Sequence, residues 1–227
     1  MAAGTEQERW LDLEGAANVR DLGGVDLEHG GRTAAGVMLR SDNLQGLTAR
    51  DVERLVDGIG LRVVVDLRTA AEVEREGPGP LLRDGRVDVR HRSLYPETGE
   101  RTDVAADTLL PWAQRPLGDH DGETPTVRSY LTYLRDRPDS IVAALRDVAH
   151  GDGATVVHCA AGKDRTGVVC ALSLAVAGVA PDAIVADYVA TADRLTPLLA
   201  RLGASPTYAP DIDESTPDNH RPRGPRR

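Results

Sequence analysis

The chain has little of what marks several protein classes. It contains two cysteines, Cys159 and Cys170, which cannot form a disulfide framework, and its residues show no metal-ligand spacing. No apolar run approaches the roughly 18 residues of a membrane-spanning helix. The first residues, MAAGTEQERW, lack the basic and apolar regions of a classical secretory signal. We therefore expect a cytoplasmic protein without stable membrane insertion and without a bound metal or other cofactor, although non-classical secretion stays open.

Lysine and phenylalanine are also scarce. The 27 basic residues include a single lysine, Lys163, and phenylalanine is absent. Because arginine serves at every other basic position, we expect Lys163 to meet a chemical need. The formal net charge of −9 argues against nucleic-acid binding and against attraction to an anionic membrane. An anionic substrate then requires a local concentration of positive charge.

Size and composition predict one folded domain with irregular ends. A chain of 227 residues with 41% apolar and 28% charged residues is ordinary for a single globular domain. Residues 1–15 are polar and are expected to form a flexible N-terminus before a domain over 16–203. Residues 204–227, rich in Pro, Asp and Arg, are expected to form a disordered tail. Residues 96–125 are expected to be either a lid over the site or a mobile surface insertion.

Apolar strands alternate with helices along the domain. The valine-rich runs at 61–67 and 154–159 suit strands that are buried on both faces. Residues 47–58 carry an apolar stripe at helical spacing that Gly58 is expected to end, and residues 127–149 read as a helix kinked or split at Pro138. This order predicts an α/β fold with a central, mainly parallel sheet flanked by helices. In such sheets ligands bind beyond the carboxyl ends of the strands.

The segment 156–167, V-V-H-C-A-A-G-K-D-R-T-G, joins a buried strand to an apolar helix and carries the chemistry. Its short loop can turn successive backbone N–H groups inward, and the N-terminus of the helix adds positive charge at the same place. The guanidinium of Arg165 can hold two oxygens of a phosphate at once. The residues expected to form this phosphate loop are Ala160, Ala161, Gly162, Lys163, Asp164 and Arg165.

Cys159 begins this loop. A thiol beside a helix N-terminus and cations is ionised at neutral pH, so Cys159 is expected to be a covalent nucleophile. Thr166 is expected to donate its hydroxyl to the sulfur and help it leave when an intermediate hydrolyses. His158 is expected to orient the start of the loop by hydrogen bonding rather than by titrating. Cys170 lies within an apolar helix and is expected to be a core residue.

The segment resembles the signature loop of the protein tyrosine phosphatase superfamily, HC-x5-R-T/S. Its A-G-K-D-R-T-G form is similar to an atypical bacterial branch, and residues 18–24, N-V-R-D-L-G-G, resemble the N-terminal motif of that branch. The strings at 39–41 and 65–68 stand where its next motifs would be. The resemblance implies a phosphatase-like α/β fold over about residues 14–200. It also implies hydrolysis of phosphotyrosine, and often of phosphoserine, phosphothreonine or phosphoinositides.

The resemblance also implies roles for individual residues. Cys159 would form the phosphocysteine, and Arg165 would bind the phosphate and stabilise the trigonal-bipyramidal transition state. Lys163 would favour doubly charged phosphates or phosphoinositide head groups. Phosphorylated proteins or phosphoinositides would be the partners, no metal would be required, and the oligomeric state stays open.

The proton donor to the leaving group is not fixed by the sequence. The superfamily commonly uses an aspartate in a movable W-P-D loop, and this string is absent here. Asp66 ends a buried strand at the expected rim of the site, and Asp164 lies in the loop itself. Carboxylates of the expected lid, such as Asp103, Asp119 or Asp121, are further candidates. Asp66 is favoured over Asp164. The structural alternative for Asp66 is a partnership with Arg20 or Arg68, and for Asp164 it is a salt bridge that stabilises the loop.

Three other functions fit parts of the pattern. The loop could capture phosphate without catalysis, although nucleophile, arginine and threonine are all present. A rhodanese-like sulfurtransferase also places a cysteine in an anion-binding loop after a strand, but usually lacks the R-T-G helix start. Arsenate reductase chemistry normally needs a resolving thiol, for which Cys170 is badly placed.

Overall fold

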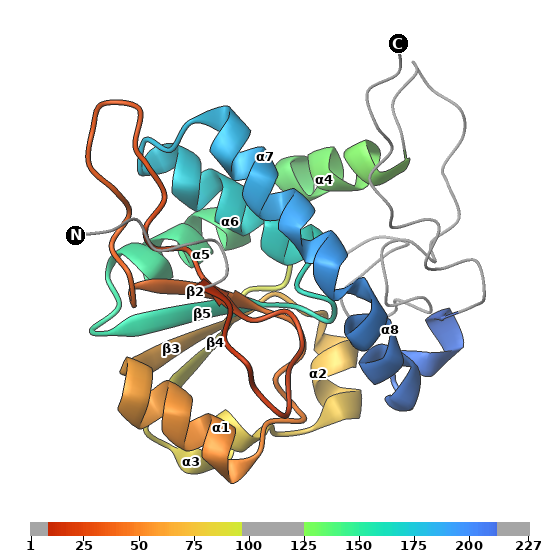
Figure 1. Ribbon diagram of the computed structural model, residues 1–227. Helices are drawn as coiled ribbons and strands as arrows, with labels where there is room; N and C mark the ends of the chain where they lie inside the picture. Colours follow the sequence, from red (N-terminus) through yellow and green to blue (C-terminus); the bar gives the residue numbers. More distant parts are fainter. Residues whose placement is uncertain (1–8, 97–124, 213–227) are drawn as a thin grey trace.

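The computed structural model describes residues 9–96 and 125–212, which form a sheet between two layers of helices (Figure 1). The strands of the sheet are β1 (Arg20–Asp21), β2 (Met38–Ser41), β3 (Leu61–Asp66), β4 (Asp88–His91) and β5 (Ala154–His158). Their spatial order is β1-β2-β5-β3-β4, and every pairing is parallel except that of β1 with β2. The predicted α/β fold with a mainly parallel central sheet is confirmed.

Helices cover both faces of this sheet. The α-helices are α1 (Ala49–Glu53), α2 (Ala70–Glu76), α3 (Pro80–Asp84), α4 (Pro125–Asp136), α5 (Pro138–Ala149), α6 (Asp164–Val176), α7 (Pro181–Ala190) and α8 (Leu195–Ala204). Figure 1 shows α4 to α7 on one side of the sheet and α1 and α3 on the other. Shorter π- and 3₁₀-helical segments are η2 (Arg54–Ile59), η3 (Thr191–Arg194) and η4 (Ala209–Asp211).

The valine runs of β3 and β5 explain why both faces need cover. Side chains of a strand point alternately to opposite faces. Val63, Val65 and Val157 accordingly join the core cluster that includes residues of α5 and α6. Val64 and Val156 join the second cluster, which includes residues of α1 and η2. A continuous apolar run is therefore what a strand in the middle of this sheet requires.

The strand register brings the carboxyl ends of three strands together. In the parallel ladders Ser41 of β2 and Asp66 of β3 both lie opposite His158 of β5. The loops that follow these strands therefore leave the sheet at one rim, as the sequence predicts. Residues 159–163 form the loop after β5.

One helix boundary differs from the sequence prediction, and another agrees with it. Thr48 caps α1 with a complete capping box, but the helix continues through the π-helical η2 and ends at Gly60, whose φ is 81°, and not at Gly58. A glycine takes this left-handed conformation without strain, so Gly60 makes the better helix end. Pro138 splits the second helix, since Arg137 separates α4 from α5.

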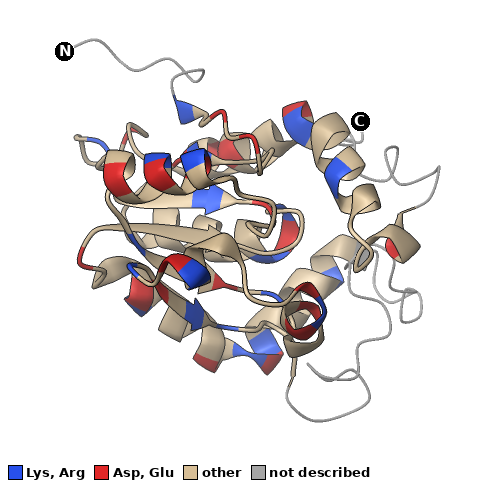
Figure 2. Cartoon of the chain, turned by 90° about the horizontal axis from the view of Figure 1, so that it is seen from below, with Lys and Arg blue, Asp and Glu red and all other residues tan. Residues whose placement is uncertain are grey.

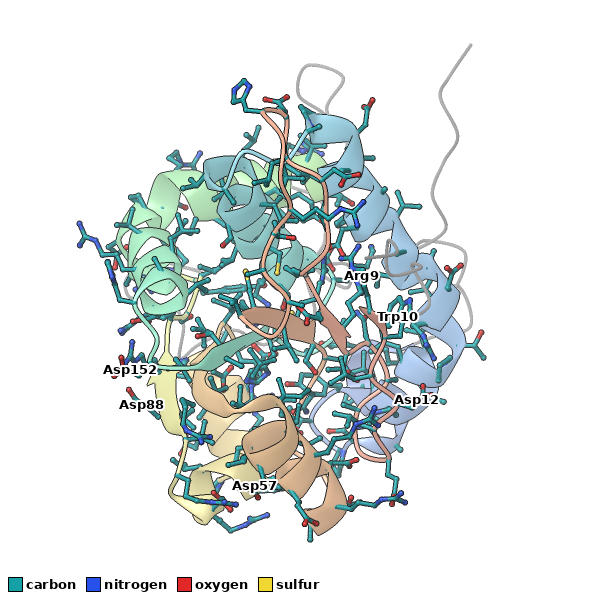
Figure 3. All side chains as sticks on the ribbon, turned by 60° about the vertical axis from the view of Figure 1, so that its left-hand side comes forward. Arg9, Trp10, Asp12, Asp57, Asp88 and Asp152 are labelled. Atoms are coloured by element: carbon teal, nitrogen blue, oxygen red, sulfur yellow. The ribbon has the colours of Figure 1, made fainter. Side chains whose placement is uncertain are left out.

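The N-terminal boundary of the domain lies earlier than residue 15. Arg9 forms an ion pair with Asp187 at 3.1 Å. Two guanidinium groups contact the ring of Trp10: its centroid lies 4.6 Å from the guanidinium of Arg20 and 4.4 Å from that of Arg194. Figure 3 shows both labelled side chains directed at the body of the domain. The expected flexible N-terminus is therefore wrong for residues 9–15, while residues 1–8 lie outside the described residues.

The C-terminal boundary of the domain lies later than the expected residue 203. Tyr208 is completely buried and belongs to a core cluster with Leu198 and Leu202 of α8 and with Ala160 and Ala161 of the loop. The expected disordered tail therefore does not begin at residue 204, because the chain to Tyr208 backs the phosphate loop. Residues 97–124, which hold nearly all of the expected lid or surface insertion, and the rest of the tail, 213–227, fall outside the described residues.

No helix in residues 9–96 and 125–212 has the length and apolar character needed to traverse a bilayer. Figure 2 shows acidic and basic residues interspersed along the same helices of the described part. The concentrated positive charge that an anionic substrate requires must therefore come from particular residues at the site.

Candidate active site

The loop after β5 is shaped by one glycine. Gly162 has a φ of 64°, which side-chain-bearing residues rarely adopt. A Cβ atom at this position would also collide with the backbone carbonyl of Ser41. The loop can therefore pass close to the end of β2 only with glycine at this position.

Hydrogen bonds hold the carbonyls of the loop outward. The Ala160 carbonyl accepts from the backbone N–H of Asn43 at 2.9 Å. The carbonyls of residues 161 and 162 accept from the Asn18 side-chain amide at 3.0 and 3.3 Å. The described chain contains no cis peptide bond, and in a trans peptide the N–H points opposite to the carbonyl. The amides of residues 161–163 therefore face the other way, which is the arrangement of an anion-binding nest.

Cys159 stands at the start of this nest and is 2% exposed. Helix α6 begins at Asp164, so its N-terminal end adds positive potential beside the loop. The hydroxyl of Thr166 is buried and, within the described chain, has no hydrogen-bond partner. The hydroxyl therefore makes no hydrogen bond to the Cys159 sulfur in this structure, and the expected donation stays a prediction.

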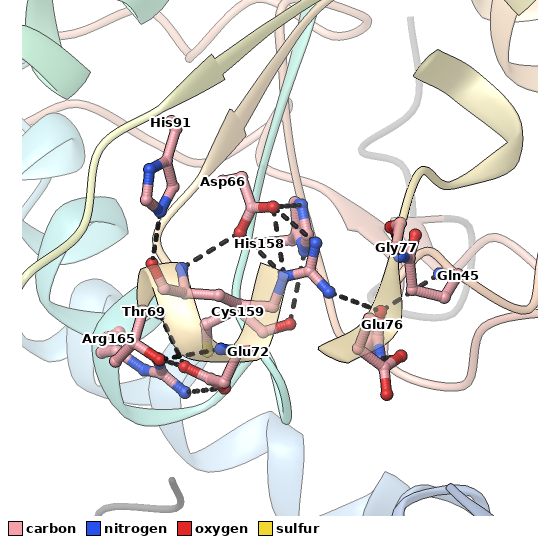
Figure 4. Close-up of polar contacts among 12 residues, drawn as sticks. Gln45, Asp66, Thr69, Glu72, Glu76, Gly77, His91, His158, Cys159 and Arg165 are labelled. Carbon is pink, nitrogen blue, oxygen red and sulfur yellow. Dashed lines mark hydrogen bonds and ion pairs between the residues drawn. The ribbon is translucent and has the colours of Figure 1, made fainter. Parts of the chain in front are cut away.

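Arg165 is fixed by a carboxylate that sequence reasoning missed. It is completely buried, and its two terminal nitrogens donate to Glu72 of α2 at 2.5 and 2.9 Å (Figure 4). Burial alone would lower the pKa of Arg165, but the Glu72 carboxylate outweighs burial and holds that pKa well above its ordinary value. Glu72 also accepts from the backbone N–H of Thr69 in the capping box of α2. This capping box is visible in the sequence, whereas the contact of Glu72 with the loop is not.

Asp66 is paired with Arg68. The Asp66 carboxylate accepts from Arg68 Nε at 2.9 Å and from Nη2 at 2.6 Å, and the side chain is 3% exposed (Figure 4). Burial alone would raise the pKa of Asp66, but the neighbouring His158 and the contact with Arg68 hold it well below its ordinary range. A carboxylate that stays ionised cannot readily carry a proton to a leaving group. This geometry favours the structural alternative for Asp66.

Asp164 has a different environment. Its Oδ1 accepts from the hydroxyl of Tyr130 at 2.5 Å, and that hydroxyl lies 2.7 Å from the hydroxyl of Tyr188. Burial and the Asp164 charge raise the pKa of Tyr130, so this phenol remains a donor. The second oxygen, Oδ2, is buried and has no partner in the described chain. Asp164 is thus held through one oxygen, while the other accepts no hydrogen bond from the described chain.

Lys163 occupies the N-cap position of α6, beside this carboxylate. Its Nζ lies 3.6 Å from Asp164 Oδ1 and 6.0 Å from the ring centroid of Tyr188. The only lysine of the sequence is therefore the last residue of the loop after β5. Its expected preference for doubly charged phosphates stays a prediction.

The two remaining candidates occupy the positions expected of them. His158 is 2% exposed, and burial lowers its pKa to about 4, so it is neutral at physiological pH. Its Nδ1 lies 3.3 Å from the Cys159 carbonyl, which fits an orienting role. Cys170 is completely buried in the core cluster of α6, and burial raises the pKa of its thiol to about 12. A thiol of this kind is inert.

The buried neutral His158 predicts a loss of stability in mild acid. Its pKa is about 4 in the folded protein and about 6.5 when unfolded, so the unfolded chain binds more protons below pH 6.5. The contribution is present above pH 6.5 and is lost as the pH falls towards 4. Asp66 acts in a lower window, because its folded pKa lies below that of an ordinary carboxyl group. Urea titrations between pH 7 and 4.5 should show a smaller pH slope for His158→Gln than for the wild type, and equal slopes would contradict this assignment.

Comparison with known proteins identifies the family. The model of the tyrosine phosphatase family matches residues 11–216. The chain belongs to this family. It is 35% identical over 162 residues to a tyrosine-protein phosphatase of Nostoc commune, a match that covers 71% of this chain and 50% of that protein. It is 31% identical over 218 residues to the triple specificity protein phosphatase PtpB of Mycobacterium tuberculosis, covering 84% of this chain and 72% of that protein.

The family match confirms the predicted family and enzyme class, those of a tyrosine phosphatase. The chain spans about half the length of the Nostoc relative. Family membership does not by itself assign roles to Cys159, Arg165 and Asp164, which rest on the geometry described above.

Proposed function

We propose that the chain hydrolyses phosphotyrosine through a phosphocysteine on Cys159. The observation that carries this proposal is the phosphate loop itself, in which outward carbonyls, the fixed Arg165 and a buried cysteine converge at the N-terminus of α6. Phosphoserine, phosphothreonine and phosphoinositides are further proposed substrates. The name of the mycobacterial relative, a triple specificity protein phosphatase, supports this breadth.

The first chemical step transfers the phosphoryl group to sulfur. The Cys159 thiolate attacks phosphorus in line with the ester oxygen, an S–P bond forms and the P–O ester bond breaks. The loop amides and Arg165 hold the three remaining phosphoryl oxygens and stabilise their charge in the transition state. Asp164 gives its proton to the leaving oxygen, so the alcohol or phenol departs neutral.

The second step regenerates the enzyme. Water attacks phosphorus and gives a proton to the Asp164 carboxylate, and the S–P bond breaks to release inorganic phosphate. The sulfur leaves as a thiolate, which the Thr166 hydroxyl stabilises by donating a hydrogen bond. Asp164 is then protonated again and ready for the next leaving group.

Acid quenching during turnover tests the proposed intermediate. With a phosphotyrosine peptide as substrate, the proteolytic fragment containing Cys159 should gain the mass of one phosphoryl group, and the fragment containing Cys170 should not. Binding of the phosphotyrosine peptide without its dephosphorylation would instead indicate a non-catalytic binding module. Turnover in a thiosulfate:cyanide assay without ester hydrolysis would indicate a sulfurtransferase.

The pH dependence of kcat should identify Asp164 as the proton donor. With phenyl phosphate, whose leaving group needs a proton, Asp164→Asn should lower kcat by about 10²- to 10⁴-fold and remove the basic limb of the pH–rate profile. The effect should be much smaller with p-nitrophenyl phosphate, because its leaving group is more acidic. Asp66→Asn is the matched comparison and should keep the basic limb. Loss of the limb in Asp66→Asn alone would assign the acid to Asp66, and its retention in both variants would point to a carboxylate of 96–125.

A further inference from the structure

A buried polar network lies directly behind the phosphate loop. Its members come from β1, β2 and α7 and from the segment before β1, and each is at most 4% exposed; they are Asn18, Arg20, Arg40 and Asp187. Building on the proposed function, we propose that this network orients the loop amides and that Asn18 and Arg40 are positioning residues for phosphate. Neither side chain forms part of the loop, so each acts through the peptide groups that it contacts.

The orientation of the Asn18 amide is dictated by Arg20. Arg20 Nη1 donates to Asn18 Oδ1 at 2.7 Å. A guanidinium can only donate, so the amide oxygen must face it and the NH₂ group must face the other way. That group donates to the carbonyls of residues 161 and 162 at 3.0 and 3.3 Å. Two consecutive peptide groups of the loop are therefore held by one side chain whose rotation is itself fixed.

Arg40 fixes the second of these peptide groups from another direction. Its Nη2 donates to the Gly162 carbonyl at 2.7 Å, and its Nη1 donates to the Asp187 carboxylate at 2.5 Å. Arg20 Nε donates to the other oxygen of Asp187 at 2.9 Å. The two arginines are thus locked by one carboxylate, and Arg40 transmits that position to the loop.

The charge of the network, like its geometry, favours phosphate binding at the loop. Burial would raise the pKa of Asp187, but Arg40 and Arg20 hold it at about 2, so the group is a carboxylate at neutral pH. Burial and the neighbouring Arg40 lower the pKa of Arg20 to about 10, which leaves it protonated. Arg9 donates to the same carboxylate at 3.1 Å, so three cations against one anion leave a net positive charge behind the amides. Such a charge favours a dianionic phosphate in front of them.

A substitution of Asn18 can distinguish a positioning role for phosphate from a role in stability alone. Substitution of Asn18 by aspartate keeps the shape of the side chain and adds an ion pair with Arg20. It also turns an oxygen towards the carbonyls of residues 161 and 162, where a donor stands in the wild type. The variant should therefore fold while the loop amides lose their fixed orientation.

The experiment measures steady-state kinetics with p-nitrophenyl phosphate, inhibition by inorganic phosphate and thermal stability. We expect Asn18→Asp to keep a melting temperature near that of the wild type, to lower kcat/KM by about 10- to 100-fold and to raise the inhibition constant of phosphate by about 10-fold or more. Asn18→Ala removes the same donors without adding charge and should show the same pattern. Thr191→Val is the matched control, because the Thr191 hydroxyl accepts from Arg20 at 3.2 Å and does not contact the loop carbonyls.

Each outcome decides the proposal. A weakened phosphate affinity in the folded Asn18 variants, with Thr191→Val close to the wild type, supports it. Phosphate affinity and kcat within 2-fold of the wild type in both Asn18 variants would overturn it, as would an equal loss in Thr191→Val. If the wild type does not hydrolyse the ester, the proposed function fails. The role of the network is then tested by phosphate binding alone, measured as the protection that inorganic phosphate gives Cys159 against alkylation by iodoacetate.

Discussion

Replacing Cys159 with serine should lower kcat for aryl phosphates by at least about 10⁴-fold and leave phosphate binding intact. A serine hydroxyl remains protonated at neutral pH and is a far weaker nucleophile than a thiolate. The loop amides and Arg165 do not change, because the substitution alters one atom at a buried position. Steady-state kinetics and equilibrium binding of a phosphotyrosine peptide would measure the two effects separately.

The second cysteine provides the control for this experiment. Cys170→Ser changes the same atom on α6, and burial raises the pKa of the Cys170 thiol to about 12, so no nucleophile is lost. Its kcat should stay near that of the wild type, with a modest decrease in stability from the buried hydroxyl. Similar losses of kcat in the two variants would mean that Cys159 does not perform the chemistry.

The loop that carries the candidate nucleophile and the candidate phosphate-binding arginine could be located from the sequence. Cys159, Arg165 and the loop between them are contiguous, and the valine runs on either side identify the strand and the sheet that carry it. The backbone conformation of Gly162 follows from its residue type, since glycine is the default where φ is positive. These features depend on residues next to one another, which is why the pattern alone sufficed.

The supporting residues depend on contacts between distant parts of the chain. Glu72 lies 93 positions from Arg165, and Asn18 lies 143 positions from Ala161. A single sequence contains no signal that joins such pairs. The sequence could not decide between Asp66 and Asp164 as the proton donor for the same reason. The decision depends on which carboxylate pairs with an arginine and which accepts a hydrogen bond from a tyrosine.

The boundary at Gly58 illustrates a different limit. A glycine near the end of an apolar stripe is a common helix stop, and two glycines, Gly58 and Gly60, compete within η2 and its cap. The π-helical turn places Gly60 at the left-handed position. Sequence pattern locates a helix well but does not distinguish between neighbouring ends.

Arg165→Lys should lower kcat/KM by about 10³- to 10⁵-fold, the range expected for an arginine that stabilises phosphoryl transfer. Lysine keeps the charge but donates from a single nitrogen, so it cannot contact Glu72 and two phosphate oxygens in the geometry of the wild-type guanidinium. The wild-type guanidinium contacts Glu72 through both terminal nitrogens, at 2.5 and 2.9 Å. We therefore expect the orienting effect of Glu72 to contribute to catalysis only when residue 165 carries a guanidinium.

A double-mutant cycle with Glu72→Gln separates these contributions. Glu72→Gln alone should lower kcat/KM, because the neutral amide holds the guanidinium less firmly. Added to Arg165→Lys it should have little further effect, since the orientation it supports has already been lost. Additive losses would show that Glu72 acts independently of Arg165, and a kcat/KM of Arg165→Lys within 10-fold of the wild type would remove Arg165 from the transition state. Because Glu72 is completely buried, thermal melting of each variant is needed to confirm that the comparison is made between folded proteins.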